Sequence, residues 1–259
     1  MAGDRLKIDI RRAKILELLQ KEGQVSIAAL SKTLGVTQTT LRTDLDTLSA
    51  DGRLIRVAGG AVSVPQSSAV QGDQPEIPCA EEKTAIAKLA AMQIRDGDTL
   101  FLNSGTTTQC VARMLLEKSR LNVVTNSLSA AKLLGSSRSI HVVLLGGEIN
   151  AEYGFTYGGD TAEQLQRYRS MWAILSVDGV DAQRGISTYH PEEAMIDRLM
   201  IRNSSQVIIA ADHRKIGRAG FSHVCELSEC SCIVTDRECD EAILSELKQT
   251  GISVKTADE

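Results

Sequence analysis

The chain has 259 residues, a formal net charge of −4 and 42% hydrophobic residues. This length is enough for two separate hydrophobic cores. No apolar run approaches the roughly 20 residues that span a bilayer. The N-terminal sequence MAGDRLKIDIRR also lacks the apolar core of a signal peptide. We therefore expect a cytoplasmic protein of two domains.

The first 50 residues carry the pattern of a helix-turn-helix. A first helix is predicted over residues 8–23. Ser26 is the expected N-cap of a second helix that ends at Gly35, and Thr37 is the expected N-cap of a third. Apolar residues of the third helix recur at i, i+4 and i+7, which predicts one buried face: Leu41, Leu45 and Leu48.

Burial of that leucine face leaves the outer N-terminal turns of the third helix exposed. A helix-turn-helix presents this part of its second helix to base edges in the major groove. Residues 54–57 and 61–64 then flank a glycine turn, which predicts a β-hairpin wing. We therefore predict a winged helix-turn-helix over residues 1–64, although a three-helix module for protein contacts has a similar pattern. Within the span Val25 to Asp44 and the wing, the expected DNA-binding residues are Ser26, Thr37, Gln38, Thr39, Thr40, Arg42, Thr43 and Arg56.

The distribution of charge favours DNA as the partner of this module. Residues 1–65 hold ten Lys and Arg against seven Asp and Glu, a net charge of +3, which leaves −7 for residues 66–259. A basic module on an acidic body suits the binding of phosphates. We interpret Asp44 and Asp46, both on the third helix, as helix-surface groups or as ion-pair groups within the module, and not as DNA contacts.

The six cysteines predict reduced thiols and no metal. Four of them are spaced C-x4-C-x-C-x6-C over residues 225–239. Structural zinc sites generally use paired C-x2–4-C motifs, which this spacing does not provide. Cys232 also lies in an apolar stretch that predicts a buried strand, where it would fill space as a small apolar side chain.

Residues 65–80 are predicted to form a linker rich in proline and serine. From residue 81 to 259, strands alternate with helices, and the strands are continuously apolar, as in a mostly parallel α/β sheet covered on both faces. The predicted strands are 99–102, 122–125, 141–145, 173–177, 206–210, 232–235 and 252–255. The predicted helices are 81–95, 106–118, 127–135, 161–168, 192–203 and 239–249.

Small polar loops follow five of these strands. In a parallel sheet ligands bind beyond the carboxyl ends of the strands, and hydroxyl and glycine residues at a helix N-terminus can bind a phosphate. Lys215, which follows the fifth strand, would neutralise such a phosphate or pair with Asp178 or Asp181. No nucleophile–base–acid set is visible. The predicted effector-binding residues are Ser104, Gly105, Thr106, Thr107, Asn126, Gly147, Asp178 and Lys215.

These motifs, in this order, resemble those of the DeoR family of bacterial transcriptional regulators over nearly the whole chain. The matching residues of the N-terminal module are Val25, Ser26, Leu30, Val36, Thr40, Leu41, Arg42, Asp44, Leu45, Leu48, Gly52, Arg56, Gly59, Gly60 and Ala61. The body matches through NSGTTT (103–108), VVTNS (123–127), GGE (146–148), VDGVD (177–181) and ADHRK (211–215). Two positions depart from the family pattern: Thr43 stands where a second arginine is common, and Ala58 replaces a histidine.

The resemblance implies a homo-oligomeric repressor of sugar or polyol catabolism genes. Its partners would be a double-stranded DNA operator and a phosphorylated sugar or polyol that releases the operator, and no cofactor is expected. The body is also similar to ribose-5-phosphate isomerase, which offers an enzyme as the alternative. That family carries a lysine and a glycine cluster shortly after its D-G-A-D-E loop, and residues 182–194 contain no lysine. We therefore expect binding without turnover. A constitutive DNA-binding protein with a vestigial body is a third hypothesis.

Overall fold

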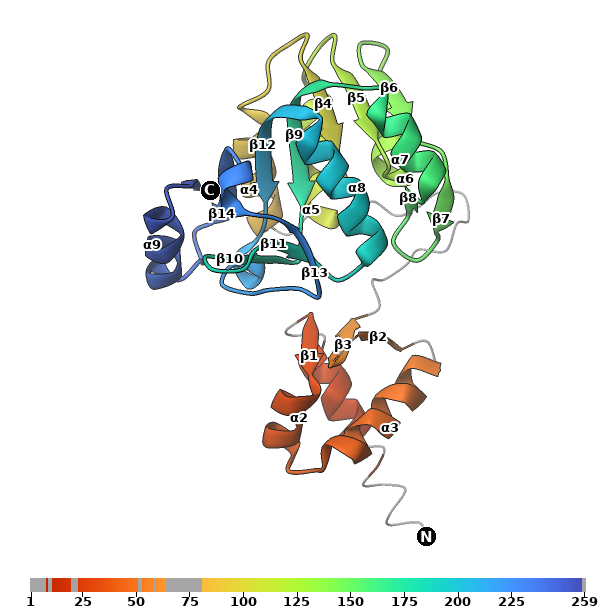
Figure 1. Cartoon of the computed structure of the whole chain (residues 1–259), viewed down its shortest axis with the longest axis vertical. Coiled ribbons are helices and arrows are strands. Elements are labelled where there is room, and N and C mark those ends of the chain that lie inside the picture. The colour runs from red at the N-terminus through yellow and green to blue at the C-terminus, as the bar shows by residue number, and fades with distance from the viewer. Residues whose placement is uncertain are drawn as a thin grey trace. The chain divides into compact units, whose positions relative to one another are not determined.

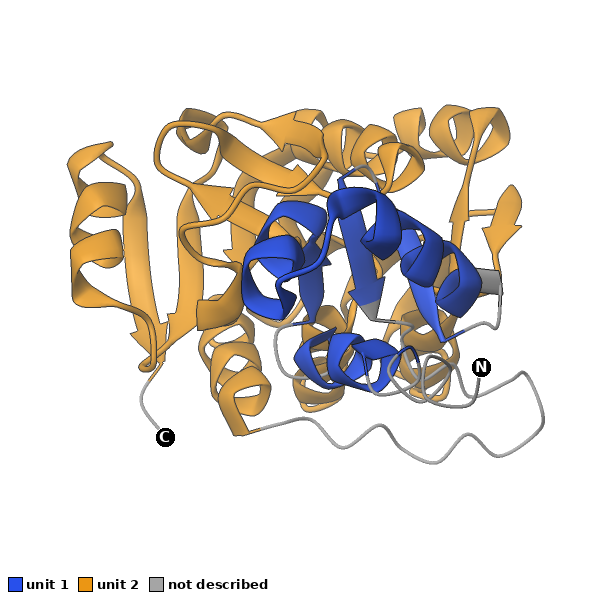
Figure 2. Cartoon of the chain, turned by 90° about the horizontal axis from the view of Figure 1, so that it is seen from below, with its two compact units in different colours: residues 1–73 blue, residues 74–259 orange. Residues whose placement is uncertain are grey.

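The computed structural model describes residues 8, 11–19, 23–50, 53–57, 59–63 and 81–257. The chain divides into two compact units, residues 1–73 and 74–259 (Figure 2). Residues 64–80, which contain the predicted linker, lie outside the described residues. None of the described helices is long and apolar enough to cross a membrane.

The N-terminal unit has the elements of a winged helix-turn-helix. Its helix over residues 11–19 is followed by β1 (Gln24–Ser26), α2 (Ile27–Leu34), α3 (Gln38–Ala50), β2 (Leu54–Val57) and β3 (Gly60–Ser63) (Figure 1). The three strands form an antiparallel sheet in the order β1-β3-β2. Strand β1 was not predicted, because three residues directly before a helix cap are too few to show an alternating pattern.

Local sequence accounts for the ends of α2 and for the wing. Ser26 caps α2 by accepting a hydrogen bond from the Ala29 N–H, and Gly35 ends the helix with a φ of 65°. Strands β1 and β3 approach so closely that a Cβ on Gly60 would lie 2.1 Å from the Val25 carbonyl oxygen. Glycine is therefore required where the wing meets β1.

The core of this unit contains the leucine face of α3. Leu41, Leu45 and Leu48 are buried, together with Ile15 and Leu30 from the preceding helices. The sequence prediction of this face is therefore confirmed. The exposed side chains of α3, which include Gln38, Thr39, Arg42 and Thr43, lie outside this core.

The C-terminal unit is built on a seven-stranded parallel sheet in the order β15-β14-β12-β9-β4-β5-β6. All seven strands were predicted, with small differences at their ends. Their bounds are β4 (Thr99–Leu102), β5 (Asn122–Thr125), β6 (His141–Leu144), β9 (Ser170–Ser176), β12 (Ser204–Ala210), β14 (Cys232–Asp236) and β15 (Ser253–Ala257).

Six helices cover the two faces of the sheet. The bounds are α4 (Glu81–Ala91), α5 (Thr106–Leu115), α6 (Leu128–Leu134), α7 (Gly159–Gln166), α8 (Pro191–Arg202) and α9 (Glu241–Gln249). One apolar cluster joins α4, α5 and α6 to one face of the sheet, and a second joins α7, α8 and α9 to the other face (Figure 1). Strand residues alternate between the clusters, as Phe101 and Leu102 do, so both faces of the sheet are covered.

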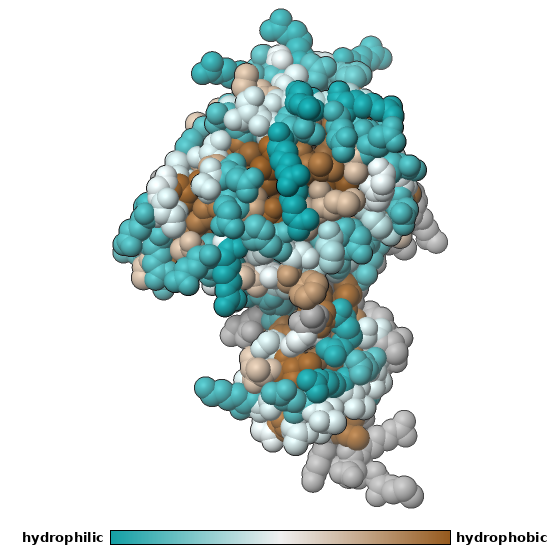
Figure 3. Space-filling model, in the orientation of Figure 1, coloured by the Kyte–Doolittle hydropathy of each residue, from teal (hydrophilic) through white to brown (hydrophobic). Residues whose placement is uncertain are grey.

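Two small sheets accompany the large one and were not predicted. Strands β7 (Glu148–Asn150) and β8 (Phe155–Tyr157) form a hairpin. Strands β10 (Gly179–Asp181), β11 (Gly185–Thr188) and β13 (Ser222–Cys225) form an antiparallel sheet. On the face of the molecule seen in Figure 3, hydrophilic residues are interspersed with hydrophobic ones.

The order of the parallel strands creates a switch point between β4 and β9. From β4 the chain adds β5 and β6 on one side, and from β9 it adds β12, β14 and β15 on the other. Ligands of open α/β sheets bind in the crevice where the strand order reverses in this way. The loops after β4 and β9 therefore meet at the position expected for a ligand.

Candidate functional site

The N-terminal turns of α3 present polar side chains to solvent. Thr37, Gln38, Thr39, Arg42 and Thr43 are all exposed. The Thr37 hydroxyl accepts a hydrogen bond from the Thr40 N–H at 3.3 Å and so caps the helix as predicted. Four of the side chains predicted to contact DNA thus lie on the side of α3 that faces away from the core: Gln38, Thr39, Arg42 and Thr43. Thr40 is half-buried, and Ser26 is the N-cap of α2.

Asp44 fixes α3 to the first helix. Its carboxylate is almost fully buried and accepts hydrogen bonds from Arg11 Nε at 2.6 Å and Arg12 Nε at 3.0 Å. Arg12 also donates to the Thr47 hydroxyl at 3.1 Å. The interpretation of Asp44 as an ion-pair group within the module is confirmed.

Asp46 joins α3 to the wing through an ion pair with Arg56. Arg56 Nε lies 2.8 Å from Asp46 Oδ1, and the Arg56 guanidinium also donates to the Gly60 carbonyl. Arg56 therefore connects α3, β2 and the wing turn. The Arg56 guanidinium is thus already engaged within the module. Its contact with DNA stays a prediction.

In the body, Asn103 joins the two strands at the switch point. Its Nδ2 donates to the Ser176 carbonyl at 2.9 Å, and its Oδ1 accepts from the Ser176 N–H at 2.9 Å. Gly105 follows with a φ of 147°, and a Cβ there would lie 2.7 Å from the Ser176 Cβ. The loop after β4 is therefore held tightly against the end of β9.

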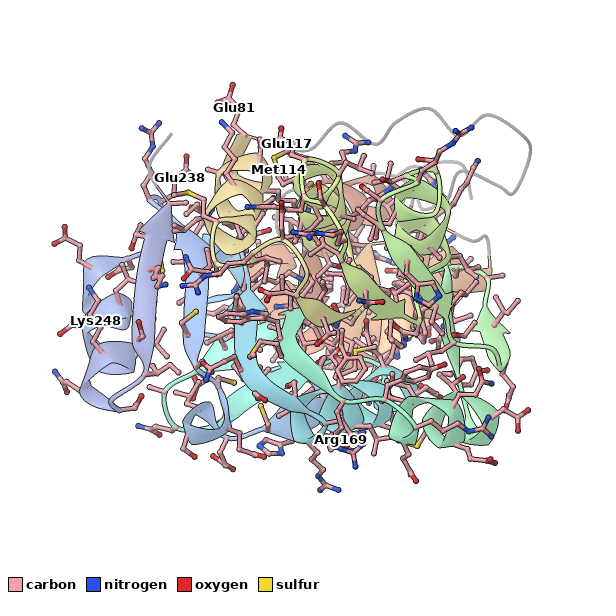
Figure 4. The ribbon with its side chains drawn as sticks, turned by 90° about the horizontal axis from the view of Figure 1, so that it is seen from above. Glu81, Met114, Glu117, Arg169, Glu238 and Lys248 are labelled. Atoms are coloured by element: carbon pink, nitrogen blue, oxygen red, sulfur yellow. The ribbon has the colours of Figure 1, made fainter. Side chains whose placement is uncertain are left out.

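The N-terminus of α5 begins in this loop and is not capped by a side chain. Its first backbone N–H groups are thus available to an anion. Thr107 is buried, whereas Thr106 is exposed and accepts a hydrogen bond from Lys83 Nζ at 2.6 Å. Lys83 comes from the first turn of α4, where the neighbouring Glu81 points away from the body (Figure 4).

Lys83 was missed by sequence analysis because nothing in the local pattern of α4 separates it from a surface lysine. Burial lowers the pKa of Lys83, and the nearby cations Arg214 and Lys215 lower it further, while Asp212 opposes both effects. Asp212 itself pairs with Arg214. A desolvated ammonium group beside an uncapped helix N-terminus favours an anionic ligand.

Asp178 and Lys215 form an ion pair at the ends of β9 and β12. Lys215 Nζ lies 2.7 Å from Asp178 Oδ1, and Asp178 Oδ2 accepts from the Thr188 hydroxyl and the Tyr189 N–H. Burial alone would raise the pKa of Asp178, but Lys215 and these hydrogen bonds lower it overall. Burial would lower the pKa of Lys215, and Asp178 raises it overall.

Two further acids of α8 border the same site and were not predicted. Glu193 accepts from the Ser104 hydroxyl at 3.2 Å and lies 2.7 Å from the Thr188 hydroxyl. Asp197 accepts from Asn103 Nδ2 at 3.0 Å and is fully buried. Burial, followed by the charge of Glu193, raises the pKa of Asp197 well above its usual value.

Contacts therefore bring Ser104, Asp178 and Lys215 into one network, through Thr188 and Glu193. The predicted residues Asn126 and Gly147 belong to a neighbouring network at the ends of β5 and β6. Asn126 Nδ2 donates to the Thr156 carbonyl, and a Cβ on Gly147 would lie 2.1 Å from the Thr161 hydroxyl oxygen. Close packing thus accounts for glycine at 147, and its contact with a ligand stays a prediction.

The β7–β8 hairpin contacts both Asn126 and the start of α8. The rings of Tyr153 and His190 are 4.4 Å apart, which places the hairpin against the start of α8. Around this region several buried polar atoms have no protein hydrogen-bond partner among the described residues: Asn126 Oδ1, the Tyr153 and Tyr189 hydroxyls, and Asp197 Oδ2. Leaving a buried polar atom unpaired costs about 1–3 kcal/mol, so a ligand rich in hydroxyl groups would recover that energy.

The cysteines of the last third of the chain are free thiols. Cys225, Cys230, Cys232 and Cys239 are buried, and the Sγ atoms of Cys225 and Cys230 lie 3.6 Å apart. Burial raises the pKa of Cys232 and raises that of Cys239 to about 11. Within the described part of the chain, no three His, Cys, Asp or Glu side chains are arranged to hold a metal ion.

Comparison with known proteins connects the two units to known families. The sequence model of the DeoR-like helix-turn-helix domain matches residues 11–67, and that of the DeoR C terminal sensor domain matches residues 79–237. The HTH-type transcriptional repressor GlcR of Bacillus subtilis is 33% identical over 94% of this chain and 94% of its own length. The glycerol-3-phosphate regulon repressor of Escherichia coli is 32% identical over 87% of this chain and 90% of its own length.

Among solved structures, a D-ribose-5-phosphate isomerase in complex with phospho-erythronic acid is similar to the chain with a TM-score of 0.39 and 20% identity. The similarity covers 51% of this chain and 52% of that one.

Proposed function

Because the chain belongs to the DeoR family of transcriptional regulators, we propose that it represses genes through its N-terminal unit and leaves the DNA when a phosphorylated sugar or polyol binds in its body. We assign residues 1–64 to DNA binding, residues 65–80 to a linker and residues 81–259 to effector binding. DNA recognition falls to the exposed N-terminal turns of α3, with Arg42 contacting a phosphate or a guanine edge.

The observation that carries the effector proposal is the uncapped N-terminus of α5 beside Lys83. A phosphate bound there would accept hydrogen bonds from backbone N–H groups and from the hydroxyl groups of Ser104 and Thr106. It would also displace the Lys83–Thr106 contact and pair with the ammonium group. A relative named glycerol-3-phosphate regulon repressor supports an effector of this class.

The remainder of the effector would lie toward Asp178 and Lys215. A carboxylate accepts hydrogen bonds from ligand hydroxyl groups, and the buried hydroxyls of Tyr153 and Tyr189 can donate or accept. This end of the site would therefore select a polyhydroxylated carbon chain. Recognition of both ends would make an unphosphorylated sugar a poor ligand.

We further propose that the site binds its ligand without converting it. Residues 182–194 contain no lysine, but Lys215 reaches Asp178 from the turn after β12, as one of the sequence-based expectations had it. The Asp178 carboxylate neutralises this ammonium group, which leaves less charge to stabilise an oxyanion. Incubation with ribose 5-phosphate and an assay for the ketose product would test this: formation of ribulose 5-phosphate at an enzymatic rate would make the protein an isomerase.

Effector binding shifts the DNA affinity only if the effector prefers one arrangement of the DNA-binding units. We propose a homo-oligomer, because two units on paired half-sites bind far more tightly than one unit alone. As a regulator that binds the chromosome, the protein would act in the cytoplasm.

A thermal-shift screen of the full chain tests the proposal. Sugar and polyol phosphates would be compared with their unphosphorylated parents, each at a fixed concentration. A ligand at a hundredfold excess over its Kd stabilises the folded state by about 2.7 kcal/mol. A shift with one phosphate and none with its parent is the expected result, followed by release of operator DNA by the same compound. A panel without any shift contradicts the phosphate site.

A further inference from the structure

A single hydroxyl group lies between two carboxyl groups in the effector site. Thr188 Oγ1 is 2.9 Å from Asp178 Oδ2 and 2.7 Å from Glu193 Oε2. A threonine hydroxyl has only one proton to donate. If both acids were ionised, one of the two contacts would join oxygen atoms with no proton between them. A second proton must therefore be present, and it has to reside on one of the carboxyl groups.

The surroundings of the two acids decide which one holds the proton. Asp178 is paired with the Lys215 ammonium at 2.7 Å and also accepts the Tyr189 N–H, so it is the ionised partner. Among the described residues, no cation forms an ion pair with Glu193. The other oxygen of its carboxyl group accepts the Ser104 hydroxyl at 3.2 Å. Asp197, one turn further along α8, has a raised pKa of its own and supplies no positive charge to Glu193.

We propose that Glu193 is protonated in the folded protein near neutral pH and positions Ser104 for the effector, so that its deprotonation weakens anion binding. The carboxyl O–H of Glu193 would donate a hydrogen bond to Thr188 Oγ1, and the Thr188 hydroxyl would donate one to Asp178. The carbonyl oxygen of neutral Glu193 would hold Ser104 weakly, which leaves that hydroxyl able to turn toward a ligand. The inference rests on the proposed function in taking the loop after β4 as the anion site.

The electrostatics of the site support this assignment. Burial, together with the Asp178 charge, raises the pKa of Glu193 to about 7, against the hydrogen bonds from Thr188 and Ser104 and the charge of Lys215. The charged and titratable groups around Glu193 are Asp178 after β9, Lys215 after β12, Asp197 on α8 and Tyr153 in the β7–β8 loop.

The direction of the pH effect follows from charge. An anion bound beside Ser104 repels ionised Glu193 and therefore favours its protonated form, so binding takes up a proton. Affinity for the anion is highest below the pKa of Glu193 and falls as the pH rises through about 7. Above that pH, the carboxylate also competes for the Ser104 hydroxyl.

A titration of the carboxyl groups without any ligand tests whether Glu193 is protonated near neutral pH. In the full chain labelled with ¹³C at glutamate carboxyl groups, the Glu193 signal, assigned by its loss in Glu193→Gln, should titrate near neutral pH. Titration near the ordinary glutamate value of about 4.3 would overturn the proposal. The exposed neighbour Glu192 on the same turn supplies the control, since Glu192→Gln should leave the Glu193 titration unchanged.

Inorganic sulfate then tests the link to binding, because it stays a dianion between pH 6 and 8, whereas phosphate itself titrates there. The wild type and Glu192→Gln should bind sulfate about tenfold more weakly at pH 8 than at pH 6, as expected for the loss of one linked proton. Glu193→Gln should show less than a twofold change. A pH dependence that persists in Glu193→Gln contradicts the proposal. Failure of sulfate to bind at either pH overturns the anion site and with it the proposed function, whereas the carboxyl titration still reports on Glu193.

Discussion

Lys83 Nζ lies 2.6 Å from Thr106 Oγ1 and so joins the first turn of α4 to the N-terminus of α5. Because α4 is the first described element of the body, this contact connects the proposed phosphate site to the N-terminal end of that unit. In the proposed site, Lys83 would both bind the effector and transmit its presence to α4.

Lys83→Ala should therefore weaken effector binding. Hydrogen bonds to charged groups contribute about 1.5–3 kcal/mol, which corresponds to a loss of affinity of about 10-fold to 150-fold. Isothermal titration with the effector found by the thermal-shift screen measures this loss. Lys88→Ala, an exposed lysine on the same helix, is the matched control and should bind normally. Equal affinities of the two variants would remove Lys83 from the site.

Lys215→Ala should leave operator binding intact and blunt the response to effector. The variant also leaves Asp178 partly buried without its cation, which should destabilise the body by about 1–3 kcal/mol at pH 7. Lys215 lowers the pKa of Asp178, so the stability that the pair provides is present above the ordinary pKa of aspartate and is lost as the pH falls.

The difference in Tm between wild type and Lys215→Ala should accordingly be larger at pH 7 than at about pH 2, below the ordinary aspartate pKa of about 3.9, as followed by circular dichroism. A normal effector response in Lys215→Ala would show that this residue acts only in stability.

Arg42→Ala should weaken binding to the operator without changing the stability of the body. Loss of a bidentate contact to a base costs about 1–3 kcal/mol, whereas loss of a phosphate contact lowers the salt dependence of binding instead. Fluorescence anisotropy at several salt concentrations separates these two roles. Arg138→Ala, which removes an exposed arginine from the body, is the control for net charge. An unchanged affinity in Arg42→Ala would contradict the proposed recognition helix.

Asp44→Asn should destabilise the N-terminal unit. The substitution removes the buried partner of Arg11 and Arg12, which should cost about 1–3 kcal/mol and detach α3 from the first helix. Asp46→Asn is the contrast, since an exposed ion pair contributes about 0–1 kcal/mol. Hydrogen exchange in the full chain reports the two units separately. Equal protection of α3 in both variants would show that Asp44 has no special role in holding the helix.

The sequence predicted the large sheet well because its strands are continuously apolar and are separated by long helices. The helical spacing of its leucines predicted the buried face of α3, and the hydroxyl side chains of Ser26 and Thr37 predicted the two helix caps. The strands of the β10–β11–β13 sheet and of the β7–β8 hairpin have three or four residues and mix polar with apolar side chains, so they were missed.

The site was predicted in part, for a related reason. Ser104, Asp178 and Lys215 stand directly after strands, and parallel strands bring such positions together. Lys83 and Glu193 sit in first turns of helices, where charged residues are common, and only the packing of those helices turns them toward the site. Thr188 reaches the site because it ends β11, a strand that the sequence did not predict.

The pairing of β4 with β9 affects the order in which the protein folds. Strands β4, β5 and β6 can pair with neighbours close in sequence, as can β9, β12, β14 and β15, but Leu100 must find Trp172 across a long separation. Contacts distant in sequence form slowly, because the loop has to be closed first. During synthesis the DNA-binding unit can fold early, whereas Ser104 meets Asp178 only after that closure. A ligand that spans the two residues would hold the two halves of the sheet together, and would thereby slow the unfolding of the whole body.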